Sequence, residues 1–490
     1  MVATAGLDTD ILIVGAGPVG LFLANECARR NLRWRIIETN PSQSLHSKAL
    51  AIFPRTLEIF DMAGVVQTFL EAANRVTSVA VITHGHTLAQ MPFQPEQTPY
   101  PFVAMVPQDV TEKILAEELK RKGGHVEYET TFVSARQDDE NAYVEATLDH
   151  RGERTTVRAA FVVGCDGAHS AVRKSINIQL EGGEYADTFM LADIETNDAL
   201  PADELQLCPS ESGPAAIFPM SATRRRLVAT VKQQEEDAPS LELVRKVLAE
   251  RAPAGIEARS LHWSSYFHIH HRHAAKLRVG RIFIAGDAAH IHSPFGGQGM
   301  NTGLHDVWNL VWKLDLFLRD HGTEQLLESY SAERLPVIEN VIATTDRLTK
   351  VMGTPNRFAQ ALRNVVIPMV SRLAPFQHAF VQRLSELGIG YADSPLVEGP
   401  GERYFDESMR GGEGIRSRFL VFANYDNEPT KEQAARQLSK AMDEIVELRE
   451  SKSPGWKLVR PDGYVAYTSQ DGDPEAAAVA MRSLLLKQAG

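Results

Sequence analysis

The feature that most constrains the fold lies near the start of the chain, where a short apolar run ends in the turn G-A-G-P-V-G. Residues 10–14 have the composition of a buried strand, and apolar residues recur at helical spacing after the turn. A G-x-G-x-x-G turn between strand and helix is typical of dinucleotide-binding proteins, because glycines permit a tight turn and close approach of a pyrophosphate. The residues predicted to hold that pyrophosphate are Gly15, Gly17, Pro18, Val19 and Gly20.

The next apolar run, residues 34–37, ends at Glu38. In the dinucleotide fingerprint, an acidic side chain after the second strand binds a hydroxyl of the adenosine ribose. A lone glycine pattern would be a weak signal, but here both flanking elements and the acid are present. The sequence therefore predicts an adenine dinucleotide. Because NAD and FAD share the fingerprint, this part of the chain leaves both open.

A second strand–turn–helix segment covers residues 280–314. Its strand ends at Gly286-Asp287, a glycine-rich turn follows, and a helical pattern starts at Asn301, which we expect to be the N-cap. A helix that starts there directs free N–H groups and a partial positive charge toward a ligand in the turn. The residues predicted to line this part of the site are Gly286, Asp287, Pro294, Gly297, Gly299, Met300 and Asn301.

A third predicted strand, residues 161–163, ends in the turn G-C-D-G-A-H-S, which contains Asp166, and a short helix with Arg173 follows. The carboxyl ends of parallel strands meet at one edge of a sheet, so we expect the three turns to converge on one extended cofactor. Gln108 and Arg55 lie near the starts of two other predicted helices. Each is a candidate ligand contact. The ordinary alternatives are a side chain within a turn for Gln108 and a surface cation for Arg55.

Charge and cysteine content restrict the partners. The chain has 490 residues and a net charge of −12, which argues against nucleic acid or an anionic membrane as a partner. The one dense basic cluster, Arg224-Arg225-Arg226, is interpreted as a solvated turn. No signal-peptide pattern and no apolar run long enough for a bilayer are present. Three widely spaced cysteines do not suit a disulfide framework, so we expect a cytoplasmic protein.

Residues 179–274 contain many short strand patterns and are interpreted as a β-rich substrate platform. The run 261–271 alternates, with Tyr266, His268 and His270 on its polar face. These three are the pocket candidates, with plain surface or core polar groups as the alternative, and no catalytic base is assigned. The histidines of this run have no cysteine or carboxylate at ligand spacing, so no metal site is predicted.

The second half of the chain is predicted to be helical and then to form a small α/β unit. Residues 323–387 have long helical patterns, and E-G-P-G at 398–401 is a plausible linker. A strand at 419–423, a helix at 432–448 and a last helix at 474–487 follow. Because this unit has no cysteine, it cannot carry out dithiol chemistry.

The three glycine turns, in this order, resemble those of the single-component class A flavoprotein monooxygenases, the aromatic hydroxylases of the para-hydroxybenzoate hydroxylase type. The motifs are G-A-G-P-V-G with Glu38, G-C-D-G-A-H-S-A-V-R-K and G-D-A-A-H-I-H-S-P-F-G-G-Q-G-M-N-T-G-L-H-D, within residues 8–350. The tail, with L-V-R-P-D-G-Y-V-A-Y, resembles the thioredoxin-like C-terminal domain of the phenol and polyketide hydroxylase branch, which also lacks redox cysteines.

The resemblance implies an α/β fold, with a Rossmann-type FAD-binding domain, an inserted β-rich substrate domain and a C-terminal thioredoxin-like α/β domain. The FAD-binding domain with its following helices would comprise residues 1–178 and 275–398. Residues 179–274, with a contribution from 80–105, would form the substrate domain, and residues 399–490 the C-terminal domain.

The same resemblance implies roles for the residues named above. The glycines of the first turn would hold the FAD pyrophosphate, Glu38 the adenosine ribose, and Gln108 the flavin phosphates or ribityl chain. Asp287 would hold the ribityl and pyrophosphate region, and residues 294–301 would lie along the isoalloxazine ring.

Two further positions concern the nicotinamide donor and a departure from the family pattern. Asp166 and Arg173 would serve both FAD and NADPH or NADH. Relatives usually have arginine where Lys48 stands. A lysine keeps the positive charge but cannot form bidentate contacts, so the pattern weakens the expected cofactor contact of Lys48.

The implied reaction is hydroxylation of a phenolic or polyketide-like aromatic substrate with NAD(P)H and O2, through a flavin C4a-hydroperoxide. Alternatives are a dehydrogenase, reductase or epoxidase of the same fold, or a non-catalytic FAD-binding module that senses redox state. A plain NAD-dependent dehydrogenase would not require the motif at Gly286. The sequence leaves open the identity of the substrate, the choice between NADH and NADPH, and the oligomeric state, for which a homodimer is one option.

Overall fold

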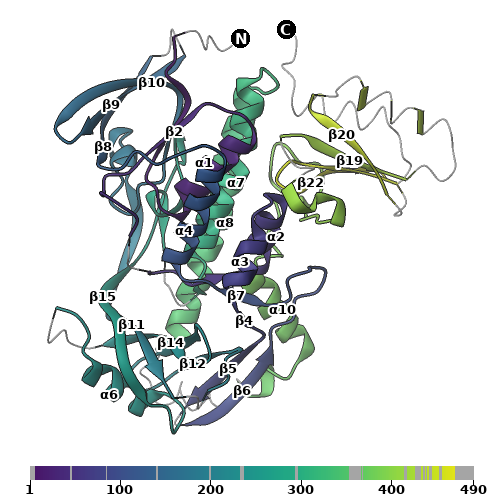
Figure 1. Cartoon of the computed structure of the whole chain (residues 1–490). Helices are drawn as coiled ribbons and strands as arrows, with labels where there is room; N and C mark the ends of the chain where they lie inside the picture. The colour runs from purple at the N-terminus through teal and green to yellow at the C-terminus, as the bar shows by residue number, and fades with distance from the viewer. Residues whose placement is uncertain are drawn as a thin grey trace.

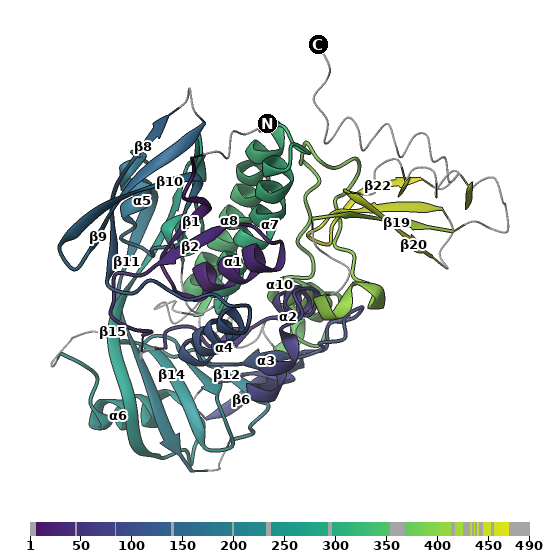
Figure 2. The same cartoon turned by 45° about the horizontal axis from the view of Figure 1, so that its top comes forward.

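The computed structural model describes residues within 6–469, which form a central α/β body, a large antiparallel sheet and a small C-terminal sheet (Figures 1 and 2). In both views the small sheet lies beside the helices of the central body, away from the large sheet. The description leaves out residues 45–46, 84, 139–141, 198–199, 232–236, 293–295, 353–365, 367, 413–416, 425–431, 434–435, 437–438, 441–443 and 452–454.

The central body contains a seven-stranded sheet with the order β16-β17-β10-β1-β2 and a hairpin of β8 and β9 beside β10. β1 (Thr9–Val14) pairs in parallel with β2 (Trp34–Ile37) and β10 (Glu153–Gly164), and β10 pairs in parallel with β17 (Ile282–Ile284). The apolar side chains of β1 are buried, as expected for a parallel strand covered on both faces. The other strands are β8 (Thr130–Asp138), β9 (Tyr143–His150) and β16 (Arg278–Val279).

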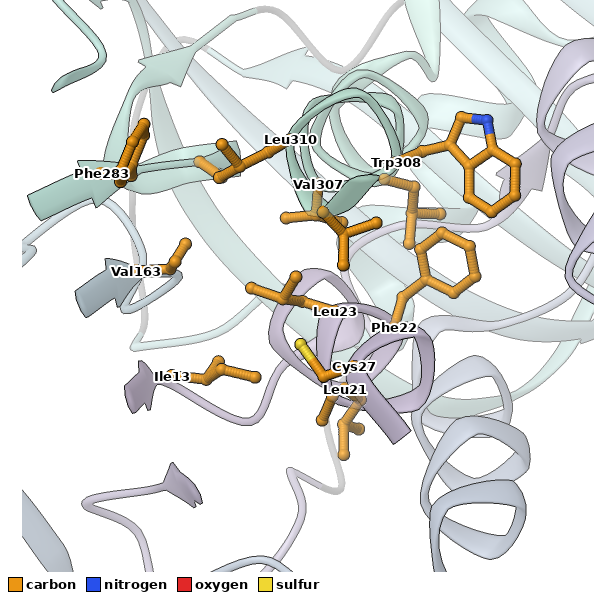
Figure 3. Close-up of a cluster of buried hydrophobic side chains, with 14 of the residues drawn as sticks. Ile13, Leu21, Phe22, Leu23, Cys27, Val163, Phe283, Val307, Trp308 and Leu310 are labelled. Carbon is orange, nitrogen blue, oxygen red and sulfur yellow. The ribbon is translucent and has the colours of Figure 1, made fainter. Parts of the chain in front are cut away.

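Two helices that follow glycine turns form the centre of the core. α1 (Pro18–Arg29) and α7 (Gly299–Leu318) pack against each other, and Figure 3 shows their buried side chains between them. The rings of Phe22 and Trp308 stack with centroids 6.1 Å apart. α7 is buried along nearly its whole length, and besides its apolar residues it carries buried polar and charged side chains such as Asn301, Asp306 and Lys313. Strand side chains in the same cluster are Ile13, Val163 and Phe283.

The large sheet has eight strands in the order β18-β15-β11-β14-β13-β12-β5-β6. α6 (Leu241–Arg251) packs on one face, where its apolar side chains join a cluster with those of the sheet. The opposite face joins a second cluster, with Leu50, Ala51, Phe53, Val76, Val103, Met105 and Val381. The strands are β5 (Ser78–Thr83), β6 (His86–Pro92), β11 (Leu180–Thr196), β12 (Glu204–Cys208), β13 (Ala215–Pro219), β14 (Arg224–Val231), β15 (Ala258–Ala274) and β18 (His290–Ile291).

The remaining helices connect these bodies. α8 (Glu324–Met352) continues through Pro336, so the helical prediction for this region holds without a break there. The others are α2 (Pro54–Met62), α3 (Val66–Ala72), α4 (Gln108–Arg121), α5 (Ala171–Ser175), α10 (Ala374–Ser385), η1 (Gly286–Ala288) and η3 (Glu407–Gly412). A three-stranded sheet has the order β3 (Ala51–Ile52), β7 (Val103–Met105) and β4 (Asn74–Val76).

The C-terminal unit is a four-stranded sheet in the order β20-β19-β21-β22. The helix predicted at 432–448 is wrong at its end, because β20 (Val446–Glu450) pairs there in parallel with β19 (Phe419–Ala423). Sheet pairing thus overrides the local helical pattern. The helix predicted at 474–487 lies outside the described residues. The other strands are β21 (Trp456–Val459) and β22 (Val465–Ser469).

The predicted fold class is confirmed: an α/β body of Rossmann type carries a β-rich part and a further α/β unit. The residue boundaries between these domains stay predictions. Among the helices that the structure describes, none combines the length and the apolar character that a membrane span requires.

Candidate functional site

The three glycine turns begin side by side at one edge of the seven-stranded sheet. Val14 is in register with Gly164, and Gly164 is in register with Ile284. Each of these residues ends its strand, so the turns at Gly15, Cys165 and Ala285 start at the same level. The strand pairing therefore brings together segments that are far apart in the sequence, as the three motifs predict.

The turns touch through backbone and small side chains. Gly15 has a φ of +102°, and a Cβ added there would lie 2.4 Å from the carbonyl oxygen of Cys165. A Cβ on Gly20 would lie 1.9 Å from the carbonyl oxygen of Gly15. Gly286 has a φ of +60° and faces Val19, whose Cγ2 would be 3.1 Å from an added Cβ. Only glycine fits at the first two positions, because backbone atoms cannot move aside as flexible side chains can.

Gly17 differs from its neighbours because space is open around it. It is the N-cap of α1 and has an ordinary φ of −74°. No side chain caps the first N–H groups of this helix. No described atom lies within 4 Å of a Cβ added at Gly17. Free N–H groups at the start of α1 and room for a close approach fit a pyrophosphate.

Glu38 holds the first turn in place. Its Oε2 accepts a hydrogen bond of 2.9 Å from the backbone N–H of Ala16, and its Oε1 accepts from the backbone N–H and the side chain of Asn40. The carboxylate is half-buried beside the opening at Gly17. Each carboxylate oxygen can accept more than one hydrogen bond, so Glu38 can also accept one from a ribose hydroxyl.

Asp287 is exposed in η1, directly after Gly286. Although the residue is exposed, the protein around it raises the pKa of its carboxyl, while the charges of His290 and Lys48 oppose that rise. The carboxylate is therefore open to a ligand beside the third glycine turn.

Asp166 and Arg173 are engaged by the protein itself. The Asp166 carboxylate accepts hydrogen bonds from the backbone N–H groups of Ala171 and Val172, and from the hydroxyl of Ser170, so it caps α5. Arg173 is buried and donates to the carbonyl oxygen of Ala288 at 3.0 Å, in the third turn, and to that of Ala168 at 3.1 Å, in the second. Arg173 thus connects the second turn to the third, whereas the printed bonds of Asp166 stay within the second turn and the start of α5, and its side chain is partly exposed.

The start of α7 differs from the prediction. The helix begins at Gly299 with Gln298 as its N-cap, so the N-cap assignment of Asn301 was wrong. Asn301 is fully buried and lies in the first turn of the helix α7. Both the oxygen and the nitrogen of its side-chain amide have hydrogen-bond partners. Its Oδ1 accepts from Phe53 N–H and the hydroxyl of Thr56, and its Nδ2 donates to the carbonyl oxygens of Ala51 and Gly297.

The other residues predicted in this turn have different surroundings. Gly297 has a φ of +64° and packs against Ala51 and Phe53, and Gly299 lies beside His292. Met300 is buried. Pro294 lies outside the described residues. The described part of the turn thus leads directly to α7, whose first N–H groups have no cap from the side chain of Gln298.

Gln108, at the start of α4, contacts the segment that contains Lys48. Gln108 Oε1 accepts from the backbone N–H of Ala49, and its Nε2 donates to Glu112. Lys48 is exposed, and its carbonyl oxygen accepts a hydrogen bond of 3.1 Å from Arg226. The side chain of Lys48 is therefore available to an anion. The side chain of Gln108 holds the backbone next to Lys48 in place through its bond to Ala49.

The sequence reasoning was wrong about the basic cluster. Arg225 and Arg226 are almost fully buried in β14, and Arg226 forms a bidentate pair with Asp193 at 2.7 and 2.8 Å. Arg226 also donates to the carbonyl oxygens of Lys48 and Ala49, so it connects the large sheet to the segment that precedes β3. A run of three arginines carries no local signal that distinguishes a buried pair from a solvated turn.

Arg55 has neither of the roles considered for it. Its side chain is fully buried, donates to Glu58 at 3.0 Å and to the carbonyl oxygen of Asp462 at 2.9 Å, and stacks on Tyr464. It is therefore an internal contact to the C-terminal unit and has no access to the glycine turns through its charged end.

The pocket candidates on β15 do not lie with the other site residues. Tyr266 packs against the cluster on the α6 face of the large sheet, and His268 is exposed. The side chain of His270 lies outside the described residues. The alternating side chains Trp263 and Phe267 pack instead on the opposite face, in a cluster that contains Ala51 and Phe53. The alternation along the strand was predicted correctly, but it is the apolar face that shares a cluster with Ala51 and Phe53, which lie against Gly297 of the third turn.

Sequence reasoning missed a buried ionic group under the third turn. Asp306 of α7 accepts from the backbone N–H of Gly286 at 3.1 Å, from His290 at 2.8 Å and from Arg334 at 2.8 Å. Burial opposes ionisation of Asp306, but Arg334 and His290 outweigh it and hold its pKa at about 2. The carboxylate thus fixes the turn that carries Asp287. The signal in the sequence was the pair His305-Asp306 inside the quoted motif.

Comparison with known proteins agrees with this geometry. The family model described as the FAD binding domain matches residues 8–345. The 6-methylpretetramide 4-monooxygenase of Streptomyces rimosus is 30% identical, over 97% of this chain and 94% of that protein. YhjG of Bacillus subtilis (strain 168), an uncharacterized aromatic compound monooxygenase, is 31% identical over 97% of both chains.

Solved structures give the same result. The OxyS anhydrotetracycline hydroxylase from Streptomyces rimosus superposes with a TM-score of 0.78 at 26% identity, covering 97% of this chain and 98% of that one. The open helix start at Gly17, the accessible Asp287 and the joined glycine turns fit FAD. The chain belongs to the FAD binding domain family and is an FAD-dependent monooxygenase of aromatic compounds that uses NAD(P)H and O2.

Proposed function

We propose that this enzyme hydroxylates a phenolic substrate of several fused rings, of the polyketide type, between the glycine turns and the apolar face of the large sheet. The observation that carries the proposal is the aromatic surface on that face. Trp263 and Phe267 are only partly buried there, and Phe267 stacks on Phe189 with ring centroids 5.7 Å apart. Partly exposed aromatic side chains suit a flat multi-ring substrate, since aromatic rings favour offset or edge contacts with one another.

The names of the relatives support the same substrate class. The Streptomyces rimosus proteins are named for 6-methylpretetramide and anhydrotetracycline, and both align over nearly the whole of this chain. A pentachlorophenol 4-monooxygenase of Sphingobium chlorophenolicum aligns with 70% of the chain. A phenol with a single ring is therefore the second substrate class that we would test.

The FAD-holding residues are also part of the proposal. The N–H groups at Gly17 would bind the pyrophosphate, Glu38 the adenosine ribose and Asp287 the ribityl region, with Lys48 as a nearby cation. When bound, FAD supplies the redox chemistry that lets NAD(P)H activate dioxygen. The start of α7 would stabilise negative charge near the ring, because its first N–H groups are uncapped. Arg173 would act indirectly, by holding the second and third turns together, and Asp166 by ordering the second turn at the start of α5.

The activity can be tested with the purified protein loaded with FAD. We expect consumption of NADPH or NADH to rise in the presence of a multi-ring phenol, with a product heavier by one oxygen atom in mass spectrometry. A panel of multi-ring and single-ring phenols separates the two substrate classes. Nicotinamide oxidation with no oxygenated product from any phenol would instead favour a reductase or dehydrogenase.

Asp287→Ala should weaken FAD binding by about tenfold or more, since it removes an exposed carboxylate beside the third glycine turn. The melting temperature of the protein after FAD removal should change little, because loss of a carboxylate whose pKa burial raises removes no stabilising charge. Fluorescence titration with FAD and thermal melting of the apoprotein measure the two effects. Unchanged FAD affinity would remove Asp287 from the site.

Oligomeric state and location stay predictions. The sequence leaves the oligomeric state open, with a homodimer as one option, and light scattering of the FAD-loaded enzyme measures it. A cytoplasmic location is predicted because Cys27, Cys165 and Cys208 are unpaired and suited to a reducing compartment.

A further inference from the structure

The loop 460–464, which joins β21 and β22 of the C-terminal unit, packs into the central body and is buried along its whole length. The carbonyl oxygen of Asp462 accepts a hydrogen bond of 3.1 Å from the indole N–H of Trp308 in α7 and one of 2.9 Å from Arg55 in α2. The unit contains no cysteine, so dithiol chemistry is not its role. Contacts such as these are where it can affect the cofactor site.

Tyr391 connects this loop to the helix α8. The residue is buried and lies between α10 and the linker at 398–401. Its ring lies against that of Tyr464, with centroids 4.4 Å apart, and the guanidinium of Arg460 is 5.1 Å from its centre. Its hydroxyl accepts a hydrogen bond of 3.1 Å from Nη1 of Arg334 in α8. The ring therefore contacts the C-terminal unit, and the hydroxyl contacts the central body.

Arg334 is fully buried and extends these contacts to the third glycine turn. Its Nε donates to Oδ1 of Asp306 at 2.8 Å. The other oxygen of Asp306 accepts from the backbone N–H of Gly286 at 3.1 Å and from Nε2 of His290 at 2.8 Å. Gly286 and His290 lie on either side of Asp287 in the sequence. The guanidinium and the carboxylate together therefore fix both ends of the segment that carries Asp287.

A second set of contacts leads from the same loop to the first turn of α7. The guanidinium of Arg55 is 4.8 Å from the ring centre of Tyr464. The next residue of α2, Thr56, donates from its hydroxyl to Oδ1 of Asn301 at 2.8 Å. Asn301 in turn donates to the carbonyl oxygen of Gly297 in the third turn at 3.1 Å. The loop of the C-terminal unit is thus connected to the third turn at two places.

We propose that Arg334 and Tyr391 are positioning residues for FAD, through which the docked loop 460–464 holds the third glycine turn in its cofactor-binding shape. The inference rests on the proposed place of FAD at the glycine turns, and it adds that the C-terminal unit sets how tightly the cofactor is held. Both side chains act without touching FAD. A guanidinium presents its donors in a fixed plane, so the position of Arg334 determines that of Asp306.

Tyr391→Phe is the central test, because it removes the acceptor of Arg334 Nη1 and keeps the ring against Tyr464. Fluorescence titration of the apoprotein should show FAD affinity lowered at least about fivefold, which is what one ordinary hydrogen bond is worth. The matched control is Tyr100→Phe, which removes a buried hydroxyl bonded to Asp61 at 2.6 Å, in a group that connects α2 to η3. That variant should melt at a lower temperature, like Tyr391→Phe, but bind FAD as the unmodified enzyme does.

A double-mutant cycle tests whether the effect of Tyr391 passes through the third turn. When Asp287→Ala has already removed the carboxylate of that turn, the loss caused by Tyr391→Phe should shrink to about twofold or less, because residues that act through one another are not additive. When the first turn is changed instead, by Gly17→Ala, the two losses of FAD affinity should multiply, because the contacts of Arg334 lead to a different turn.

Tyr464→Leu tests the contribution of the C-terminal unit itself, and it should weaken FAD binding at least about threefold by removing the ring beside Tyr391. Unchanged FAD affinity of Tyr391→Phe or Tyr464→Leu, an equal loss in Tyr100→Phe, or losses that multiply in the Asp287→Ala background would each overturn the inference. If Asp287→Ala alone still weakens FAD binding, the proposed site stands without the inference. Unchanged affinity of Asp287→Ala would remove the proposed site, and the inference with it.

Discussion

Arg460→Met should lower the free energy of unfolding by about 3–5 kcal/mol, because it leaves two carboxylates in the protein interior with too few cations. Arg460 is fully buried and lies in the R-P-D-G-Y motif of the C-terminal unit. Its Nη1 and Nη2 donate to Glu333 of α8 at 2.6 and 2.8 Å, and its Nε and Nη2 donate to Asp462 at 3.0 and 2.5 Å.

The group around Arg460 is balanced in charge and extends to α7. Lys313 donates to Glu333 at 2.7 Å, and Asn309 donates to Glu333 at 2.7 Å and to Asp462 at 3.1 Å. Two cations thus face two carboxylates, all fully buried. Loss of one cation leaves an uncompensated negative charge in a medium of low dielectric constant, which is far costlier than loss of a surface pair.

A matched control is Lys113→Met on α4, which removes an exposed cation 4.0 Å from Glu117. That change should alter stability by less than about 1 kcal/mol. Urea unfolding of both variants, with and without FAD, measures the difference. A similar small effect of both substitutions would mean that the C-terminal unit is docked without energetic coupling to α7 and α8.

The network around Arg460 also shows why part of the fold could be predicted from the sequence and part could not. The turn at Gly15, Gly17 and Gly20 is local: strand, glycines and helix follow each other within one short segment, and the requirement for glycine is backbone geometry. The linker predicted at 398–401 was read from composition in the same way. Composition does not reveal that Arg460, beyond the linker, contacts Glu333 and fills the interior next to α7.

Buried polar residues were the main source of error at the site. Asn301 has the side chain of a good N-cap, but its four partners come mostly from residues 51–56, far away in sequence. Arg226 looks like a surface cation until Asp193 is brought opposite it by the pairing of β11 with β14. In each case the decisive partner is set by tertiary structure, which periodicity does not encode.

Gly17→Ala should weaken FAD binding by about 10–100-fold while leaving the apoprotein as stable as before. Gly17 has a φ of −74°, which alanine adopts readily, and no described atom lies within 4 Å of the added Cβ. The methyl group would instead occupy the space at the start of α1 where a phosphate must approach. Loss of one charge-assisted hydrogen bond, worth about 1.5–3 kcal/mol, gives the expected loss of affinity.

Gly20→Ala is the contrasting substitution three residues away, and it should destabilise the apoprotein itself by about 1–3 kcal/mol or more. Its Cβ would lie 1.9 Å from the carbonyl oxygen of Gly15, a backbone atom, so α1 must move away from β1. Thermal melting of the two apoproteins and fluorescence titration with FAD separate the cases. If Gly17→Ala retains full FAD affinity, the pyrophosphate does not lie at this helix start, because no other cost of that methyl group is visible among the described residues.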